Sequence, residues 1–296
     1  MMKHLHNRTR EIITNSTDEE RILSIKNVKW IGYSQASAII GRFKELLNYP
    51  VNHRMPNILL VGDSNNGKTA LLNKFIKSNQ SYVEDETCKL IVPTLLIQAP
   101  PEPDERRFYN AILESLFAPY KSSEKIEMKQ QRVIHLLKKV ELRLLIIDEI
   151  HHVLAGNLSK QRSFLNVLKF LSNELRISMI CSGTKDAFNA IQTDSQLANR
   201  FEPKVLKKWK NDEEYLRLLA SFESLLPLKE ASMLIESSIS TKILAMSEGL
   251  IGEISRILEL ASILAIESGV EKINRNILNN IDYTSPSDRK KMIFKL

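Results

Sequence analysis

Cysteine is scarce in this 296-residue chain, which contains only Cys88 and Cys181. Neither lies at the spacing of a metal-binding cluster, and two cysteines cannot form the disulfide framework of a small secreted fold. One of them also lies within an apolar strand pattern. The pair therefore predicts reduced thiols in a reducing compartment.

Long hydrophobic runs are also lacking. No window approaches 18 uncharged apolar residues, and the first 15 residues contain no apolar core for a secretory signal. The sequence therefore predicts a cytoplasmic protein with no membrane partner. Hydrophobic residues make up 43% and charged residues 26%, which is typical of a globular protein and excludes extensive disorder. The length suits one α/β domain followed by a small helical one.

Positive charge is in modest excess. The 42 basic and 35 acidic residues give a net charge of +7, and the pI is about 9.2. Such a balance permits an anionic partner such as nucleic acid but does not demand one.

The chain is organised around a glycine loop at Asn57–Thr69, N-I-L-L-V-G-D-S-N-N-G-K-T. An apolar strand pattern leads into Gly62, and Gly67-Lys68-Thr69 opens a helical pattern, which is the order of a P-loop. Backbone N–H groups of such a loop bind a β-phosphate, lysine reaches the β/γ oxygens, and the threonine hydroxyl binds Mg²⁺. The alternative is a loop that merely turns. The residues predicted to bind ATP here are Gly62, Asp63, Ser64, Asn65, Asn66, Gly67, Lys68, Thr69 and Ala70.

A second apolar run, Leu144–Ile147, ends in Asp148 and Glu149. Four consecutive aliphatic residues indicate a parallel strand buried on both faces. Together with a P-loop, the first acid is predicted to hold Mg²⁺ and the second to polarise the attacking water. Strand ends are often charged for no catalytic reason, so the interpretation depends on the pairing with the P-loop.

Two residues further along are candidates for completing the site. Thr184, or Ser182, ends the strand pattern at 177–184 and is predicted to sense the γ-phosphate, although strand ends are often polar. Arg200 ends a predicted helix just before the strand pattern at 201–206 and is predicted to act as an arginine finger in a neighbouring subunit's site. Favourable interaction with the helix dipole is the alternative explanation.

Histidine and aromatic pairs allow more than one interpretation. His151 and His152 are adjacent, which argues against both binding one zinc ion, so we expect them to order the loop or contact a partner. Trp30 and Tyr33 precede a helix pattern that begins at Ser34. They either flank the adenine or anchor the N-terminal arm on the core.

Beyond Asn211 the apolar period is 3.6 throughout, which predicts a helical lid. The predicted domains are an N-terminal arm at 1–33, an α/β domain at 34–209 and the lid at 210–296. A basic cluster with Trp209 in its midst precedes the lid and either meets nucleic acid or solvates the hinge; its members are Lys204, Lys207, Lys208 and Lys210.

These motifs in this order resemble AAA+ ATPases, and further segments resemble the TniB family of transposon ATPases, relatives of TnsC. The segments that carry the resemblance are Lys29–Tyr33, Arg54–Thr69, Ile146–Gly156, Cys181–Thr184 and Trp209–Glu223. The resemblance covers roughly residues 20 to 285. It implies an ATP- and Mg²⁺-dependent ATPase that regulates DNA transposition. Such a protein forms rings or filaments on double-stranded DNA and links a TniQ-type target-selection protein to the transposase.

The family motifs map onto the residues already named, with one departure. Many AAA+ lids place a sensor arginine near the first turn of the helix that starts G-L-I-G, but here Gly252 and Glu253 stand there. Arg256, one turn later, is the candidate for this sensor, or none is present. DNA contacts are predicted in loops after the second strand, at Arg106, Arg107 and Lys125. Alternative functions are a loader for replication or repair machinery and a signalling NTPase used as a nucleotide switch.

Overall fold

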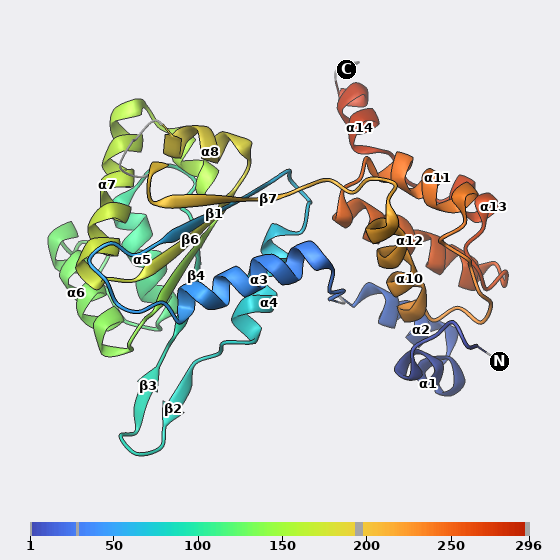
Figure 1. The fold of residues 1–296 in the computed structure, drawn as a ribbon, viewed down its shortest axis with the longest axis horizontal. Coiled ribbons are helices and arrows are strands. Elements are labelled where there is room, and N and C mark those ends of the chain that lie inside the picture. Colours follow the sequence, from blue (N-terminus) through green and yellow to red (C-terminus); the bar gives the residue numbers. More distant parts are fainter. Residues whose placement is uncertain (1, 28–29, 193–197, 294–296) are drawn as a thin grey trace. The chain divides into compact units, whose positions relative to one another are not determined.

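The computed structural model describes residues 2–27, 30–192 and 198–293. The chain divides into two compact units (Figure 1). The α/β unit comprises Gln35–Leu206, and the helical unit comprises Met1–Ser34 together with Lys207–Leu296. The N-terminal segment, which the sequence sets apart as an arm, thus belongs to the same unit as the C-terminal helices. No helix in the described parts of the chain is long and apolar enough to span a bilayer.

A five-stranded parallel sheet forms the centre of the α/β unit, in the order β4-β5-β6-β1-β7. Its strands are β1 (Asn57–Gly62), β4 (Thr94–Gln98), β5 (Leu144–Asp148), β6 (Ser178–Gly183) and β7 (Phe201–Leu206). Every residue of β1, β5 and β6 is buried, as the apolar patterns of the first two predicted. Because the strands are parallel, their carboxyl ends meet at one edge of the sheet.

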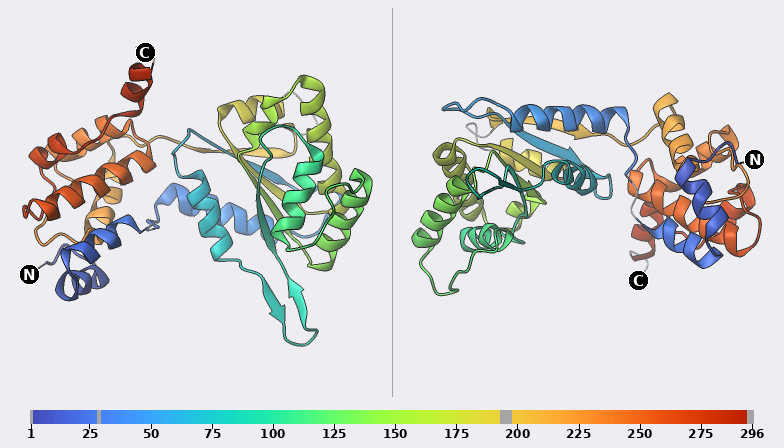
Figure 2. Two further views of the ribbon diagram at one scale, coloured as in Figure 1. Left: turned by 180° about the vertical axis from the view of Figure 1, so that it is seen from behind. Right: turned by 90° about the horizontal axis from the view of Figure 1, so that it is seen from below.

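Helices cover both faces of this sheet (Figure 2). They are α3 (Ser34–Leu47), α4 (Lys68–Lys77), α5 (Glu105–Ser115), α6 (Ile126–Lys139), α7 (Leu158–Leu175) and α8 (Lys185–Gln192), with the 3₁₀ helix η1 at Ile150–Ala155. On one face, Phe108 of α5 packs edge-on against Phe164 of α7. Phe43 of α3 and Phe75 of α4 make a similar contact. The sheet is therefore the middle layer of an α/β/α arrangement.

An antiparallel hairpin projects from the α/β unit between α4 and β4 (Figure 1). Its strands are β2 (Tyr82–Glu84) and β3 (Lys89–Ile91). The apolar run at 90–98 forms parts of two strands, β3 and β4, with Pro93 between them. Proline has no N–H to donate to a sheet, which explains the break.

The helical unit is built around α12 (Ile251–Glu267). The other helices are α1 (Asn7–Asn15), α2 (Asp18–Lys26), α10 (Glu213–Leu225), α11 (Ser237–Ser247), α13 (Arg275–Asn280) and α14 (Pro286–Ile293). Helix α2 packs against α12, and its residue Ile25 lies in the same core as Ile257 and Leu258. A capping box starts α2: the Thr17 side chain accepts from Glu20 N, and the Glu20 carboxylate accepts from Thr17 N.

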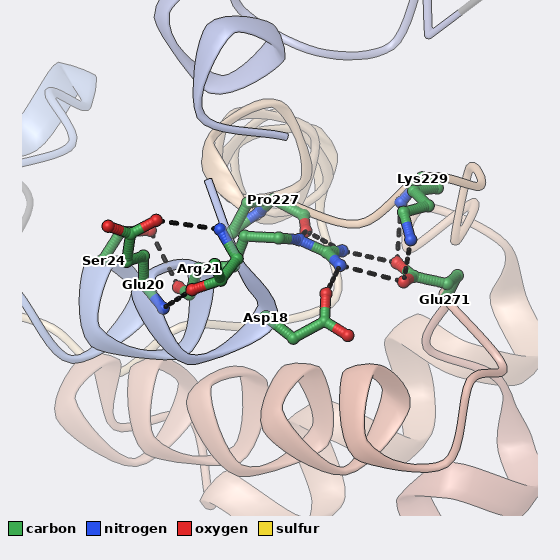
Figure 3. A network of polar contacts seen from close by, with 8 residues as sticks. Asp18, Glu20, Arg21, Ser24, Pro227, Lys229 and Glu271 are labelled. Atoms are coloured by element: carbon green, nitrogen blue, oxygen red, sulfur yellow. Dashed lines mark hydrogen bonds and ion pairs between the residues drawn. The ribbon is translucent and has the colours of Figure 1, made fainter. Parts of the chain in front are cut away.

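A buried ion cluster fastens α2 to the rest of the helical unit (Figure 3). Arg21, whose side chain is 1% exposed, donates to both Glu271 carboxylate oxygens at 2.9 and 2.5 Å. It also donates to the Pro227 carbonyl and to Asp18. Lys229 Nζ lies 3.0 Å from Glu271. Burial alone would raise the pKa of Glu271, but hydrogen bonds from Arg21 and Lys229 outweigh it and lower the pKa to about 2.

Candidate nucleotide site

Strand β1, the loop and α4 form the P-loop in the predicted order. The strand ends at Gly62, and the helix begins at Lys68. Gly67 precedes the helix with φ +84°, a left-handed conformation that side chains disfavour. The amide of Asn66 donates to the Leu206 carbonyl at 2.9 Å, which ties the loop to the end of β7. This bond fixes the loop between β1 and α4 against the neighbouring strand.

Lys68 points back into the loop. Its ammonium donates to the carbonyls of Gly62 and Asp63, each at 2.9 Å, and the residue is 5% exposed. Burial lowers the pKa of Lys68, while the negative charges of Glu149, Asp148 and Asp63 oppose that shift. A buried ammonium whose hydrogen bonds to described residues all go to carbonyls is a strong partner for an entering anion.

The Thr69 hydroxyl donates to Asp148 Oδ2 at 2.7 Å, which joins the start of α4 to the end of β5. Neighbouring ligands of an octahedral Mg²⁺ lie about 2.9 Å apart, because each metal–oxygen distance is about 2.0–2.1 Å. The two oxygens therefore fit adjacent positions around one Mg²⁺. Both are hard oxygen donors, as this ion prefers.

Glu149 follows Asp148 in a left-handed backbone conformation with φ +56°. Its N–H donates to Asp148 Oδ1 at 2.9 Å, so the magnesium-binding candidate also fixes the next residue's backbone. The Glu149 carboxylate lies 3.1 Å from His151 Nδ1. A non-glycine residue in this conformation is strained, and such strain is typical of functional sites.

The two histidines lie in η1, with ring centroids 4.8 Å apart. Potential ligand atoms of Glu149, His151 and His152 all lie within 4.8 Å of one another. The two histidines are thus closer together than we expected when their adjacency argued against both binding one zinc ion. Tetrahedral zinc requires ligand atoms about 3.3 Å apart, from bonds of about 2.0–2.1 Å. His151 Nδ1 lies near the Glu149 carboxylate but makes no hydrogen bond to any described residue. The expectation that the histidines order the loop or contact a partner stays a prediction.

Strand β6 lies between β1 and β5, so Thr184 follows a strand flanked by both site-bearing strands. The hydroxyl oxygens of Ser182 and Thr184 are buried and have no hydrogen-bond partner among the described residues. Buried hydroxyls are rarely left unpaired, so their free capacity suits a polar ligand. Gly183 lies between them, and a Cβ there would come within 2.7 Å of Ala187 Cβ and 3.1 Å of Ile150 Cγ2. The close approach packs η1 and α8 onto β6.

Arg200 lies at the opposite edge of the sheet. Its carbonyl accepts from Asn57 N, at the first residue of β1, whereas the P-loop follows the last. Six residues at about 3.3 Å each separate these ends by about 20 Å. Arg200 is therefore far from its own P-loop. The helix predicted just before it lies partly outside the described residues.

Sequence reasoning missed two polar side chains in this region. Asn173 of α7 accepts from Arg200 Nη1 at 2.6 Å. Asn57, which is 2% exposed, accepts from Met179 N at 2.8 Å and so joins the starts of β1 and β6. The only signal for Asn57 was a polar residue opening an apolar strand, and nothing in the sequence marks Asn173.

A family model described as "Bacterial TniB protein" matches residues 21–211, which is most of the chain and includes every element of the site described so far. The chain belongs to the TniB family. Comparison with curated proteins finds no match.

Solved structures similar to this TniB-family chain share its fold. The Aeropyrum pernix ORC2 protein in ADPNP–ADP complexes gives a TM-score of 0.57 at 13% identity, covering 86% of this chain and 69% of that one. Aeropyrum pernix ORC1 in complex with DNA gives 0.55 at 14% identity, covering 92% and 69%. The Thermotoga maritima RuvB Holliday junction branch migration motor gives 0.52 at 15% identity, covering 86% and 71%. The fold is that of AAA+ ATPases, as the sequence predicted.

Three predicted nucleotide contacts of this TniB-family chain, Trp30, Tyr33 and Arg256, lie in the helical unit. Tyr33 packs edge-on against Trp209, with ring centroids 5.0 Å apart, and burial raises its pKa to about 12. This contact anchors Tyr33 within the helical unit. A role at the adenine stays a prediction for Trp30 and Tyr33.

The lid position that carries an arginine in many AAA+ proteins holds a buried glutamate here. Glu253 accepts from Tyr283 OH at 2.6 Å and pairs with Arg289 of α14. Arg256 is half exposed and pairs with Glu259 at 2.7 Å. Its role as a sensor therefore stays a prediction, and such a role would require it to leave Glu259.

The predicted DNA contacts lie around the start of α5 and the loop that leads to α6. Arg106 donates to the carbonyls of Ser122 and Glu124, so its guanidinium holds the loop in place. Arg107 lies near two carboxylates, at 3.5 and 3.9 Å. Lys125 is exposed at the start of α6. Contact with DNA stays a prediction, and Lys125 is the most available of the three.

Proposed function

We propose that this protein is an ATP-dependent regulator of DNA transposition, an ATPase that assembles on target DNA. The observation that carries the proposal is the Thr69–Asp148 contact beside the buried Lys68, in a chain of the TniB family. Together these residues supply the lysine, hydroxyl and carboxylate that bind a magnesium triphosphate. Such a regulator acts on DNA in the bacterial cytoplasm.

Each residue of the site has a separate task in hydrolysis. Lys68 neutralises β- and γ-phosphate oxygens, and Thr69 and Asp148 hold Mg²⁺, which supplies charge neutralisation when bound. Glu149, fixed by its backbone bond to Asp148, accepts a proton from the attacking water. Thr184 offers its unpaired hydroxyl to the γ-phosphate.

Assembly follows from the position of Arg200 at the far edge of the sheet. Because it lies about 20 Å from its own P-loop by strand length, it can reach a triphosphate only in another copy. When one face of a copy contacts a different face of the next copy, a dimer still has both kinds of face unoccupied. Further copies can therefore add, which gives a ring or a helical filament. In this proposal the assembly follows the DNA backbone and connects a TniQ-type target-selection protein to the transposase.

The test compares three variants in ATP-dependent DNA binding and electron microscopy. Lys68→Ala should abolish ATP-dependent assembly on duplex DNA, whereas Lys74→Ala removes an exposed lysine from the same helix and should leave assembly intact. Glu149→Gln should bind ATP, fail to hydrolyse it and leave long-lived assemblies. DNA affinity should also fall steeply with salt, because phosphate contacts release counterions. If Lys68→Ala assembles like wild type, the proposed ATP switch is wrong.

A loader of replication or repair machinery is the second candidate, because the fold is shared with ORC1 in complex with DNA and with the RuvB Holliday junction branch migration motor. Such a loader would hydrolyse ATP with the same residues, so nucleotide assays do not separate the two functions. Reconstituted transposition does. The transposition proposal requires insertion of donor DNA to depend on this protein and to fail with Lys68→Ala.

A further inference from the structure

A pocket of about 400 Å³ lies at the edge of the sheet opposite the P-loop. Its walls come from the segment that leads into β1 and from the segment that leads into β7. The lining residues that matter here are Tyr49, Arg54, Asn57, Asn199, Arg200 and Glu202. Two arginines thus face one cavity from two separate segments of the chain.

Neither arginine is neutralised by a carboxylate. Among the residues that the structure describes, Arg54 and Arg200 form no ion pair, and Arg54 makes only a 3.4 Å contact with the Asn199 carbonyl. Glu202, the acidic residue of the lining, is already paired with Arg42 at 3.1 Å and Lys204 at 2.5 Å. The pocket therefore has an excess of positive charge available to an anion.

The backbone around Arg54 is anchored while its side chain stays exposed. Met55 is 3% exposed, and the next residues enter β1, whose first residue Asn57 is bonded to both neighbouring strands. Arg200 is oriented separately by Asn173. Arg54 lies three residues before β1 and Arg200 directly before β7, so the two guanidiniums belong to segments that lead into adjacent strands of the sheet.

We propose that this pocket receives the triphosphate bound by a neighbouring copy, and that Arg54 is a second arginine supplied in trans beside Arg200. This inference rests on the proposed function, because it requires the copies to assemble around ATP. Two planar guanidiniums can bind different oxygens of one triphosphate, which explains why one pocket exposes both. A DNA phosphate is the competing anion. Arg200, which lines the same pocket, is already proposed to contact the nucleotide of a neighbouring copy, so the triphosphate is the favoured anion.

The decisive experiment mixes two defective variants. Arg54→Ala keeps its own P-loop but loses the second arginine, and Glu149→Gln keeps the pocket but cannot hydrolyse ATP. Arg54→Ala alone should lose about 10- to 100-fold in ATP hydrolysis, the range for one hydrogen bond to a charged group. In an equal mixture, about one quarter of the contacts pair an intact site with an intact pocket, so activity per subunit should recover to about one quarter of wild type.

Three measurements accompany this test. Arg217→Ala removes an exposed arginine of the helical unit and should hydrolyse ATP like wild type. Arg54→Lys restores the charge without the planar fork and should recover only part of the activity. Thermal unfolding should be unchanged in Arg54→Ala because the side chain is exposed.

Each adverse result has a separate meaning. If wild-type protein does not hydrolyse ATP or assemble with it, the proposed function fails first. If Arg200→Ala is inactive but Arg54→Ala is like wild type, or if the mixture does not recover, the second arginine in trans is wrong. If Arg54→Ala hydrolyses ATP normally but binds DNA more weakly, with a salt slope smaller by about one, the pocket binds the DNA backbone instead.

Discussion

Replacing Arg21 with methionine should strongly destabilise the helical unit. The substitution keeps an unbranched apolar stem but leaves Glu271 buried without its main cation. Breaking a buried ion pair by removing one partner costs about 3–5 kcal/mol. Lys229 still contacts Glu271, so we expect the lower end of this range, about 3 kcal/mol. That loss corresponds to a factor of about 150 in the folding equilibrium.

Tryptophan fluorescence reports on this unit alone. The chain has two tryptophans, Trp30 and Trp209, and both belong to the helical unit. With a urea dependence of roughly 1.5 kcal/mol per M, the unfolding midpoint should fall by about 2 M. Circular dichroism follows both units together, so a second transition at the wild-type midpoint should mark the unaffected α/β unit.

Two further variants decide the cause. Arg21→Met combined with Glu271→Met removes both charges and should recover most of the lost stability, because an apolar pair needs no ionic partner. Arg217→Ala breaks an exposed pair with Glu213 in the same unit and should shift the midpoint by less than about 0.5 M. A midpoint shift in Arg21→Met as small as that of Arg217→Ala would refute the reasoning.

Three other outcomes are expected. The pKa of Glu271 is lowered to about 2 from its usual value near 4.5, so its contribution to stability should be complete above pH 4.5 and lost as pH falls toward 2. Between pH 4.5 and 2, the urea midpoint of wild type, measured by fluorescence, should therefore fall more than the midpoint of Glu271→Met. Thr69→Val should weaken ATP binding about tenfold when Mg²⁺ is present and have little effect when it is chelated, as titration calorimetry would show; an equal loss in both conditions would contradict the Mg²⁺ assignment. Gly183→Val should destabilise the α/β unit by about 1–3 kcal/mol in thermal unfolding, because its side chain meets Ala187 and Ile150, whereas Gly41→Ala, with open space around it, should not.

The sheet and the nucleotide loop are the parts that the sequence predicts best. Their signals are local: an apolar run ending in Gly62 gives β1, and another ending in Asp148 gives β5. Parallel order then brings these ends to one edge, which explains why Thr69 and Asp148, 79 positions apart, meet at 2.7 Å. The sequence assigned both residues to one Mg²⁺ ion, but it did not predict that their side chains would contact each other directly.

The remaining features depend on contacts that no local pattern reveals. Arg21 looks like an exposed arginine after a capping box, and its burial depends on Glu271, which lies 250 positions further along. The orientation of Arg200 depends on Asn173, an amide on a helix surface. The β2–β3 hairpin escapes prediction because Tyr82 and Val83 are exposed and follow a polar stretch, so no buried face marks it.

The helical unit is discontinuous in the chain, and this has a consequence for its synthesis. Helices α1 and α2 leave the ribosome before the helices that cover them, which come after the whole of Gln35–Leu206 has been made. At about 5–20 residues per second, that interval lasts roughly 10 to 30 s. During this interval the α/β unit can fold, while Arg21 and Ile25 stay exposed to solvent because the residues that bury them have not yet been synthesised. Removing the first 27 residues to obtain a smaller fragment would accordingly leave the last helices with an uncovered core.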